Sequence, residues 1–159
     1  MRLIKAFGSR VLVADPYVAL SAEDADDGVR RVTLKTLLNE SDVVTLHARL
    51  TAETRGFIGR AEFAAMREGA VFINTARGPL VDYDALTEAL KSGRLRGAAL
   101  ETFAVEPAPV GAELLRLDNV TLTPHIAGAS LKTIERAADM AAEEMRRYLA
   151  GEALLNPCA

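Results

Sequence analysis

The chain has 159 residues, with 19 lysines and arginines against 22 aspartates and glutamates, which gives a formal charge of −3. The length is typical of one domain, and a composition that is 50% hydrophobic and 26% charged is typical of a globular protein rather than a disordered one. The mild acidity disfavours nucleic acid as a partner, the short apolar runs disfavour a membrane span, and one cysteine with two histidines excludes a zinc cluster. We therefore expect a cytoplasmic protein without a metal site.

Strand and helix patterns alternate along the chain. Short unbroken apolar runs predict buried strands, and apolar spacings of three and four residues predict amphipathic helices. The predicted strands are 11–14, 43–46, 71–74, 98–100 and 120–122. The predicted helical segments are the last turns of a helix at 2–7, followed by 33–39, 61–67, 82–90 and 130–149. Glycines at 8, 69, 93 and 151 are predicted to end four of these helices, and residues 21–28 are predicted to form an acidic loop.

Five alternations imply right-handed crossovers and a parallel sheet covered by helices on both faces. In such α/β sheets, ligands bind beyond the carboxyl ends of the strands. Polar residues follow all five predicted strands, at Asp15, His47, 74–77, Glu101 and His125. The sequence therefore predicts a functional site along this one edge of the sheet.

Four polar residues, three at these strand ends and Glu106 in the loop after the fourth strand, have both a chemical and a structural interpretation. Asp15 could bind ribose hydroxyls or form an Asp-Pro turn, and Arg77 could bind a carboxylate or pair with a surface acid. His125 could transfer a proton near neutral pH or be structural, and Glu106 could hold that imidazole or stand in a Glu-Pro turn. Arg77, Glu106 and His125 together indicate a small acid with an adjacent hydroxyl or carbonyl, whose hydride carrier would be a cofactor.

Several motifs in order resemble the D-isomer-specific 2-hydroxyacid dehydrogenases, which include phosphoglycerate dehydrogenase and the glyoxylate/hydroxypyruvate reductases. The motifs are DVVTLH at 42–47, NTARG at 74–78, GAALE at 97–101, VEP at 105–107 and TPHIAG at 123–128. The resemblance implies a Rossmann-like doubly wound parallel sheet, NAD as cofactor, a small 2-hydroxy or 2-oxo acid as substrate, and a homodimer. It implies catalytic roles for Arg77, Glu106 and His125. It implies cofactor contacts at Asp15, Thr75, Ala76, Arg77, Glu101, His125, Ala127 and Gly128.

Three features depart from the family pattern. Glu101 stands where the family usually has aspartate, and Arg49 stands where it often has proline. The family's Gly-x-Gly-x-x-Gly turn is absent, because no two glycines of this chain are two positions apart. We therefore expect residues 1–159 to form a partial dinucleotide-binding domain without its first strand, its glycine-rich turn or the family's substrate-binding domain. We expect such a chain to bind NAD weakly as a monomer.

In the doubly wound order 3-2-1-4-5-6, the absent strand would be the central one. We place the strands 11–14 and 43–46 in positions 2 and 3, and the later three in positions 4 to 6. Two other functions remain open at this point. One is a non-catalytic NAD-binding regulatory module that resembles the C-terminal-binding protein corepressors, and the other is an inactive remnant of the enzyme.

Overall fold

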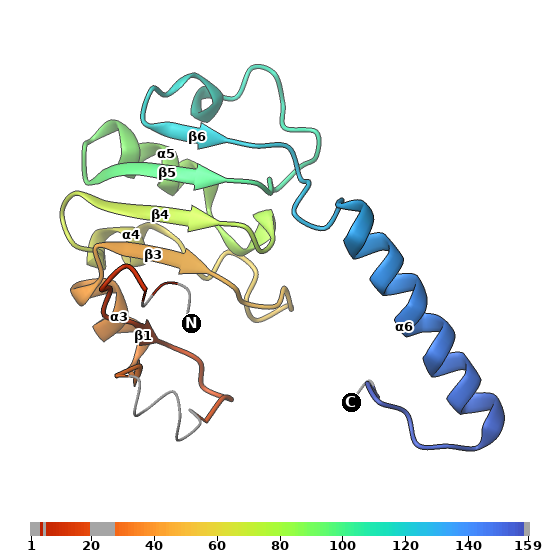
Figure 1. Cartoon of the computed structure of the whole chain (residues 1–159). Helices are drawn as coiled ribbons and strands as arrows, with labels where there is room; N and C mark the ends of the chain where they lie inside the picture. Colours follow the sequence, from red (N-terminus) through yellow and green to blue (C-terminus); the bar gives the residue numbers. More distant parts are fainter. Residues whose placement is uncertain (1–3, 5, 20–27, 158–159) are drawn as a thin grey trace. The chain divides into compact units, whose positions relative to one another are not determined.

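The computed structural model describes residues 4, 6–19 and 28–157. Cys158, half of the predicted helix end at 2–7 and most of the acidic loop at 21–28 lie outside the described residues. The chain divides into two compact units, residues 1–123 and 124–159, and each is described by itself. Figure 1 shows their elements.

The first unit contains all of the described strands, and every ladder is parallel. Its strands are β1 (Leu12–Val13), β2 (Arg30–Arg31), β3 (Val43–Leu46), β4 (Ala70–Asn74), β5 (Leu95–Leu100) and β6 (Val120–Leu122). Its helices are α3 (Leu34–Glu40), α4 (Arg60–Ala65), α5 (Tyr83–Lys91) and the 3₁₀ turns η1 (Gly78–Leu80) and η2 (Glu113–Arg116). The α/β class, the parallel pairing and the five predicted strands are confirmed.

The predicted strand order is wrong. The strands form a two-stranded sheet, β1-β2, and a four-stranded sheet, β3-β4-β5-β6. Val43 pairs with Val71, so β3 lies directly beside β4 and not beside β1. The cause is β2, an additional strand of two exposed arginines that has no apolar pattern and takes the place beside β1. Among the described residues, no ladder joins the two sheets.

One face of the four-stranded sheet carries the core of the first unit. Val44, Phe72 and Leu100 point to this face and are buried, and α4 and α5 lie behind the sheet in Figure 1. The rings of Phe63 and Phe72 meet edge to face, with centroids 5.3 Å apart. The opposite face is more open, since Val43 of β3 is 52% exposed. Helices were predicted to cover both faces, and the alternating exposure of β3 contradicts this for the edge strand.

Side-chain caps at the predicted positions set where the helices begin. Asp82 Oδ1 accepts hydrogen bonds from the backbone N–H groups of Asp84 and Ala85, both at 3.0 Å, and starts α5. Thr33 caps α3 in the same way. Such caps satisfy backbone donors that have no partner within the helix. The predicted start of α5 at Asp82 is confirmed. The prediction that Gly69 ends the helix at 61–67 is wrong, because the C-cap of α4 is Met66.

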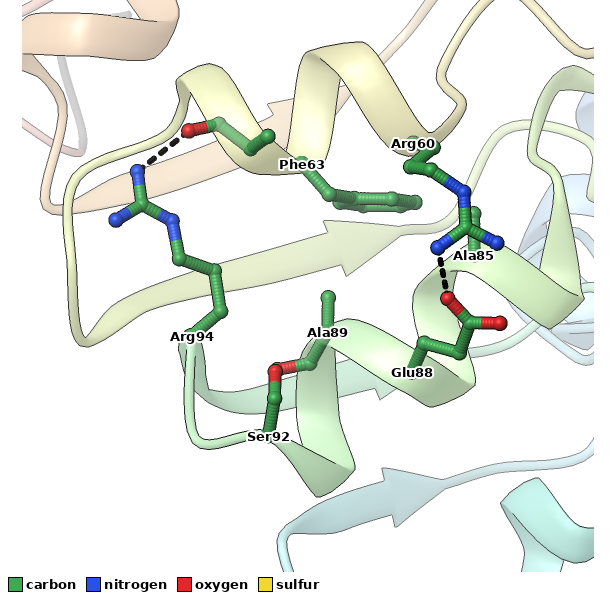
Figure 2. A pocket seen from close by; sticks show the side chains of 8 residues that line it. Arg60, Phe63, Ala85, Glu88, Ala89, Ser92 and Arg94 are labelled. Carbon is green, nitrogen blue, oxygen red and sulfur yellow. Dashed lines mark hydrogen bonds and ion pairs between the residues drawn. The ribbon is translucent and has the colours of Figure 1, made fainter.

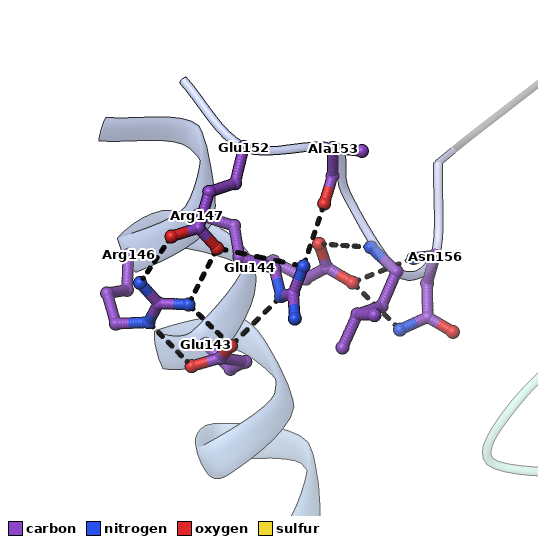
Figure 3. Close-up of polar contacts among 8 residues, drawn as sticks. Glu143, Glu144, Arg146, Arg147, Glu152, Ala153 and Asn156 are labelled. Atoms are coloured by element: carbon purple, nitrogen blue, oxygen red, sulfur yellow. Dashed lines mark hydrogen bonds and ion pairs between the residues drawn. The ribbon is translucent and has the colours of Figure 1, made fainter. Parts of the chain in front are cut away.

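The second unit consists of α6 (Leu131–Ala150) and the tail that follows it. Ser130 caps the start of α6, and Gly151 ends it with a left-handed φ of 69°. The tail folds back along the helix, where the Glu144 carboxylate accepts hydrogen bonds from the backbone N–H groups of Leu155 and Asn156 (Figure 3). No residue of α6 is buried.

Candidate active site

The turn after β4 is organised by a buried asparagine. Asn74 is 0% exposed, and its Oδ1 accepts a hydrogen bond from the backbone N–H of Ala76 at 3.0 Å. Its Nδ2 donates to the backbone carbonyl of Arg77 at 3.1 Å. The turn is therefore closed from within, and the side chains of Thr75 and Arg77 are exposed at the carboxyl end of the strand.

A very close backbone contact joins this turn to the segment after β5. A Cβ atom on Gly78 would lie 1.9 Å from the carbonyl carbon of Phe103 and 2.4 Å from the backbone nitrogen of Ala104. Only glycine fits such a contact, because non-bonded carbon atoms normally stay about 3.5–4.0 Å apart. The contact brings the chain next to Arg77 against the chain three residues before Glu106.

Glu106 is anchored to that same segment. Its Oε1 accepts a hydrogen bond from the backbone N–H of Phe103 at 2.9 Å. Tyr83 of α5 supports the segment from the other side, since its hydroxyl donates to the backbone carbonyl of Thr102 at 2.5 Å. Burial, and to a lesser extent the negative charge of Glu106, raises the pKa of Tyr83 to about 12. The structure thus brings together the segments that carry Arg77 and Glu106.

Two polar side chains are buried at the carboxyl end of β5. Glu101 is 5% exposed and Thr102 is 1% exposed. The Oγ1 atom of Thr102 has no hydrogen-bond partner among the described residues. Buried polar groups are normally paired, so this strand end is a polar position within an otherwise apolar core.

Asp15 adopts the turn that the Asp-Pro pair predicts. Its Oδ1 accepts a hydrogen bond from the backbone N–H of Tyr17 at 2.8 Å. Arg31 of β2 donates to the backbone carbonyls of Asp15 at 3.0 Å and of Pro16 at 2.9 Å. Sequence reasoning missed Arg31, because nothing in its local pattern indicates that it lies beside Asp15.

His47 and Arg49 follow β3. The Nε2 atom of His47 lies 3.1 Å from Thr45 Oγ1, and the backbone carbonyl of Arg49 accepts a hydrogen bond from Thr54 Oγ1 at 2.7 Å. The contact with Thr45 indicates a structural role for His47. The Arg49 side chain is exposed.

His125, Ala127 and Gly128 belong to the second unit and are exposed. They follow β6, whose end is fixed where the backbone N–H of Thr123 donates to the carbonyl of Leu100 at 3.0 Å. The structure brings the segments of Arg77 and Glu106 together within the first unit. The grouping of His125 with them stays a prediction.

Two surface hollows are lined by described residues, and only the first of them lies away from these strand ends. One of about 520 Å³ lies between α4 and α5, where Phe63 forms the floor, the Arg60–Glu88 ion pair stands at one end and Arg94 at the other (Figure 2). A second, of about 290 Å³, lies between α5 and the 103–115 segment. The first is a structural groove, because Arg94 donates to the backbone carbonyl of Ala64 and Arg60 is paired to Glu88.

The described residues contain no group of three or more histidine, cysteine, aspartate or glutamate side chains placed to hold a metal ion. No helix among them is both long enough and apolar enough to cross a membrane.

Residues 1–127 match the family model for the D-isomer specific 2-hydroxyacid dehydrogenase, NAD binding domain. The chain belongs to this family. It is 44% identical to a glyoxylate reductase of Korarchaeum cryptofilum over 153 residues, which cover 95% of the chain and 45% of the relative. It is 43% identical to a D-3-phosphoglycerate dehydrogenase of Methanocaldococcus jannaschii over 154 residues, which cover 96% of the chain and 29% of the relative.

Solved dehydrogenase structures share the fold. The holo form of D-mandelate dehydrogenase from Rhodotorula graminis matches with a TM-score of 0.91 and 34% identity, over 99% of this chain and 46% of that one. A D-isomer specific 2-hydroxyacid dehydrogenase from Xanthobacter autotrophicus Py2, in complex with NADPH and MES, matches with a TM-score of 0.79 and 39% identity, over 93% of this chain and 59% of that one. The chain thus has a Rossmann-like α/β fold, and NAD is the cofactor of its domain family. It spans 45% and 29% of the two curated relatives and 46% and 59% of the two solved structures.

Proposed function

We propose that this chain is the cofactor-binding part of an enzyme that transfers a hydride between NAD(H) and C2 of a small 2-hydroxy or 2-oxo acid. The observation that carries the proposal is the pairing of two rigid strand-end segments, the Asn74–Arg77 turn and the 103–106 segment, around Gly78. Catalytic groups need such fixed supports, because small displacements of a catalytic group sharply reduce the rate.

Arg77 is the residue proposed to hold the substrate. Its guanidinium is exposed at the strand end, where Nη1 donates to the backbone carbonyl of Ala76 at 2.7 Å. That bond uses one of five guanidinium donors, which leaves a fork that can bind a carboxylate through two parallel bonds. Arg77 would thereby orient the C2 carbon of the substrate.

His125 is the proposed acid/base. Its imidazole would take the proton from the C2 hydroxyl when the acid is oxidised and return it when the oxo acid is reduced. An unperturbed imidazole has a pKa of about 6.5, which suits both directions near neutral pH. Glu106 would stabilise the imidazolium that forms. Glu106 is a positioning residue in this scheme, and its anchor on the Phe103 N–H would keep it in place.

The residues present fit the two ends of a dinucleotide. The buried Glu101 offers carboxylate acceptors for a carboxamide, and Asp15 offers acceptors for ribose hydroxyls. The sequence has no glycine pair that could form a phosphate-binding turn. NAD supplies the hydride acceptor when it is bound. We also propose a preference for NAD over NADP, because the Asp15 carboxylate would repel a 2′-phosphate.

Three accompanying assignments belong to the same proposal. Residues 1–159 form part of one dinucleotide-binding domain, the protein works in the cytoplasm, and it works as a homodimer. The first is supported by the family match over residues 1–127 and the second by the composition.

A chimera tests the chemistry. The aligned part of this chain, 95% of its residues, would replace the matching region of the Korarchaeum glyoxylate reductase, whose remaining sequence would complete the enzyme. We expect glyoxylate-dependent oxidation of NADH, and slower turnover with NADPH. His125→Gln should lower kcat by about 10²–10⁴-fold while the NADH dissociation constant changes little.

The control is Arg77→Ala, which should raise KM and lower kcat together, because the guanidinium would bind the substrate in both ground and transition states. A chimera that binds NADH but turns over none of glyoxylate, hydroxypyruvate or phosphohydroxypyruvate would overturn the enzymatic proposal. That result would favour the non-catalytic module. A near-unchanged kcat for His125→Gln would remove His125 from the mechanism.

A further inference from the structure

The hydroxyl group of Tyr83 lies between the two segments that carry Arg77 and Glu106. It donates a hydrogen bond to the backbone carbonyl of Thr102 at 2.5 Å. Burial and the charge of Glu106 raise the pKa of Tyr83, and a hydrogen bond from the Asn74 side chain lowers it, so both groups lie near this hydroxyl. One side chain of α5 thus reaches both the turn after β4 and the segment after β5.

Tyr83 stands on a rigid base. It is the first residue of α5, directly after the Asp82 cap. The inner side of the helix is buried at Ala85, Leu86, Ala89 and Leu90. The ring of Tyr83 also packs beside the ring of Phe103, with centroids 6.3 Å apart. The position of the hydroxyl is therefore fixed by a packed helix and by a ring contact with the segment to which it binds.

Water cannot take over the role of this hydroxyl. Thr102 is only 1% exposed, so its carbonyl is closed to solvent. The Oγ1 atom of Thr102 has no hydrogen-bond partner among the described residues, and the site therefore holds no spare donor there. A buried acceptor without a donor costs free energy, and a chain segment shifts to find one. Loss of the Tyr83 hydroxyl should therefore displace the segment that begins at Thr102.

The displacement would pass directly to Glu106 through one peptide unit. The carbonyl of Thr102 and the N–H of Phe103 belong to the same peptide bond. Its oxygen accepts from Tyr83, and its N–H donates to Glu106 Oε1 at 2.9 Å. Because a peptide unit is planar, a bond that fixes the direction of its carbonyl also fixes the direction of its N–H. The bond from Tyr83 therefore sets where the N–H that anchors Glu106 points.

We infer that Tyr83 is a positioning residue for the proposed reaction, which fixes the Thr102–Phe103 peptide plane so that its N–H holds the Glu106 carboxylate in place. The inference rests on the proposed function, because the position of Glu106 affects the rate only if its carboxylate stabilises the imidazolium of His125.

Arg77 depends less on Tyr83 than Glu106 does. Asn74 closes the turn at Arg77 with two hydrogen bonds of its own, to Ala76 and to Arg77, and both remain when the Tyr83 hydroxyl is removed. The proposed grip on the substrate carboxylate is therefore kept, whereas the support of the imidazolium is weakened. The imidazolium forms during the reaction, so the expected signature is a loss of kcat with little change in KM.

Steady-state kinetics of the chimera test this signature. Tyr83→Phe should lower kcat for glyoxylate about tenfold, which is part of the loss of about 10²-fold that a misplacement of about 1 Å can cause. KM should change by less than about twofold. Ser92→Ala is the matched control on the same helix, because it also deletes one hydroxyl that donates to a backbone carbonyl, that of Ala89 at 3.2 Å. The control should keep the kcat of the unmodified chimera.

A double-mutant cycle separates positioning from a general loss of stability. In a Glu106→Gln background, Tyr83→Phe should have almost no further effect on kcat, because the charge that it positions is absent. An equal loss of kcat in both backgrounds would overturn the inference, since Tyr83 would then act on a group other than Glu106. An unchanged kcat for Tyr83→Phe in an active chimera would also overturn it, and would leave the proposed function intact.

Amide hydrogen exchange of the full 159-residue chain tests the same link without turnover. The N–H of Phe103 should exchange about tenfold faster in Tyr83→Phe, relative to the N–H of Phe72 in β4, and this ratio should stay the same in Ser92→Ala. Taking the ratio removes changes in global stability, because global unfolding exposes both amides. An unchanged ratio in Tyr83→Phe would overturn the inference. A chimera without turnover would instead overturn the proposed function, and the exchange ratio would still decide whether Tyr83 fixes the peptide unit that anchors Glu106.

Discussion

Gly78→Ala tests whether the Asn74–Arg77 turn and the 103–106 segment are held together by close backbone contact. The added Cβ would lie 1.9 Å from the carbonyl carbon of Phe103 and 2.0 Å from its oxygen. An unstrained contact needs about 3.5 Å, so one of the two backbone segments must move by roughly 1.5 Å. Both segments are fixed, since Asn74 closes the turn on one side and Tyr83 holds Thr102 on the other. Relief by a side-chain rotation is excluded, because the obstructing atoms are backbone.

The expected loss of unfolding free energy is at the upper end of the range for overpacked sites. We expect about 3 kcal/mol of unfolding free energy to be lost. For a unit of this size, that loss corresponds to a fall in Tm of about 9–15 °C. In the chimera, kcat/KM should fall as well, because the movement separates the chain at Arg77 from the chain at Glu106.

Thermal melts followed by circular dichroism would measure the effect. The matched control is Gly111→Ala, since a Cβ there meets nothing within 4 Å and its φ is not in the left-handed region. This control should melt within about 2 °C of the wild-type chain. If Gly78→Ala melted as the control does, the close contact between the turn and Phe103 would be wrong.

Two further predictions concern α5. Tyr83→Phe should cost about 1–2 kcal/mol at neutral pH, since the carbonyl of Thr102 loses its donor. The folded state raises the pKa of Tyr83 from 10 to about 12, so its stabilising effect is complete below pH 10 and is lost as the pH rises towards 12. Urea titrations between pH 7 and 11 should show a steeper alkaline loss for wild type than for Tyr83→Phe, and parallel curves would refute the assignment. Asp82→Ala should cost about 1 kcal/mol through the lost cap, whereas Asp82→Asn should retain most of it, and equal losses in urea melts would show that the cap does not contribute.

Local signals in the sequence predicted the elements well. Asp82, Ser130 and Gly151 were correctly placed at helix ends, because each acts through hydrogen bonds or backbone angles within a few residues of itself. The five apolar strands were found for a similar reason, since a buried strand needs a continuous apolar run. The predicted strand bounds also placed the Asn74–Arg77 turn correctly, at the carboxyl end of β4.

Long-range pairing could not be read from the same signals. β2 consists of Arg30 and Arg31, two exposed residues whose strand character comes only from hydrogen bonding to β1. Because β2 was not predicted, each later strand was assigned one position too early in the doubly wound order. The strand 43–46 was therefore placed beside the strand 11–14, whereas it pairs with β4. The role of Arg31 beside Asp15 was missed for the same reason, since the two residues are 16 positions apart. The contact between Gly78 and Phe103 was missed for the same reason, because it joins the segment after β4 to the segment after β5.

Arg94 makes helix α4 depend on a distant part of the chain. Its guanidinium donates to the backbone carbonyl of Ala64 (Figure 2) and to that of Met66, at the end of a helix of only six residues. A helix this short does not form alone in water, because nucleation costs more than a few hydrogen bonds return. The last turn of α4 is completed by a residue that immediately precedes β5, so the helix and the sheet behave as one cooperative folding unit. Its amide protons would then exchange with solvent at the pace of the central strands, and not at the pace of a fraying surface helix.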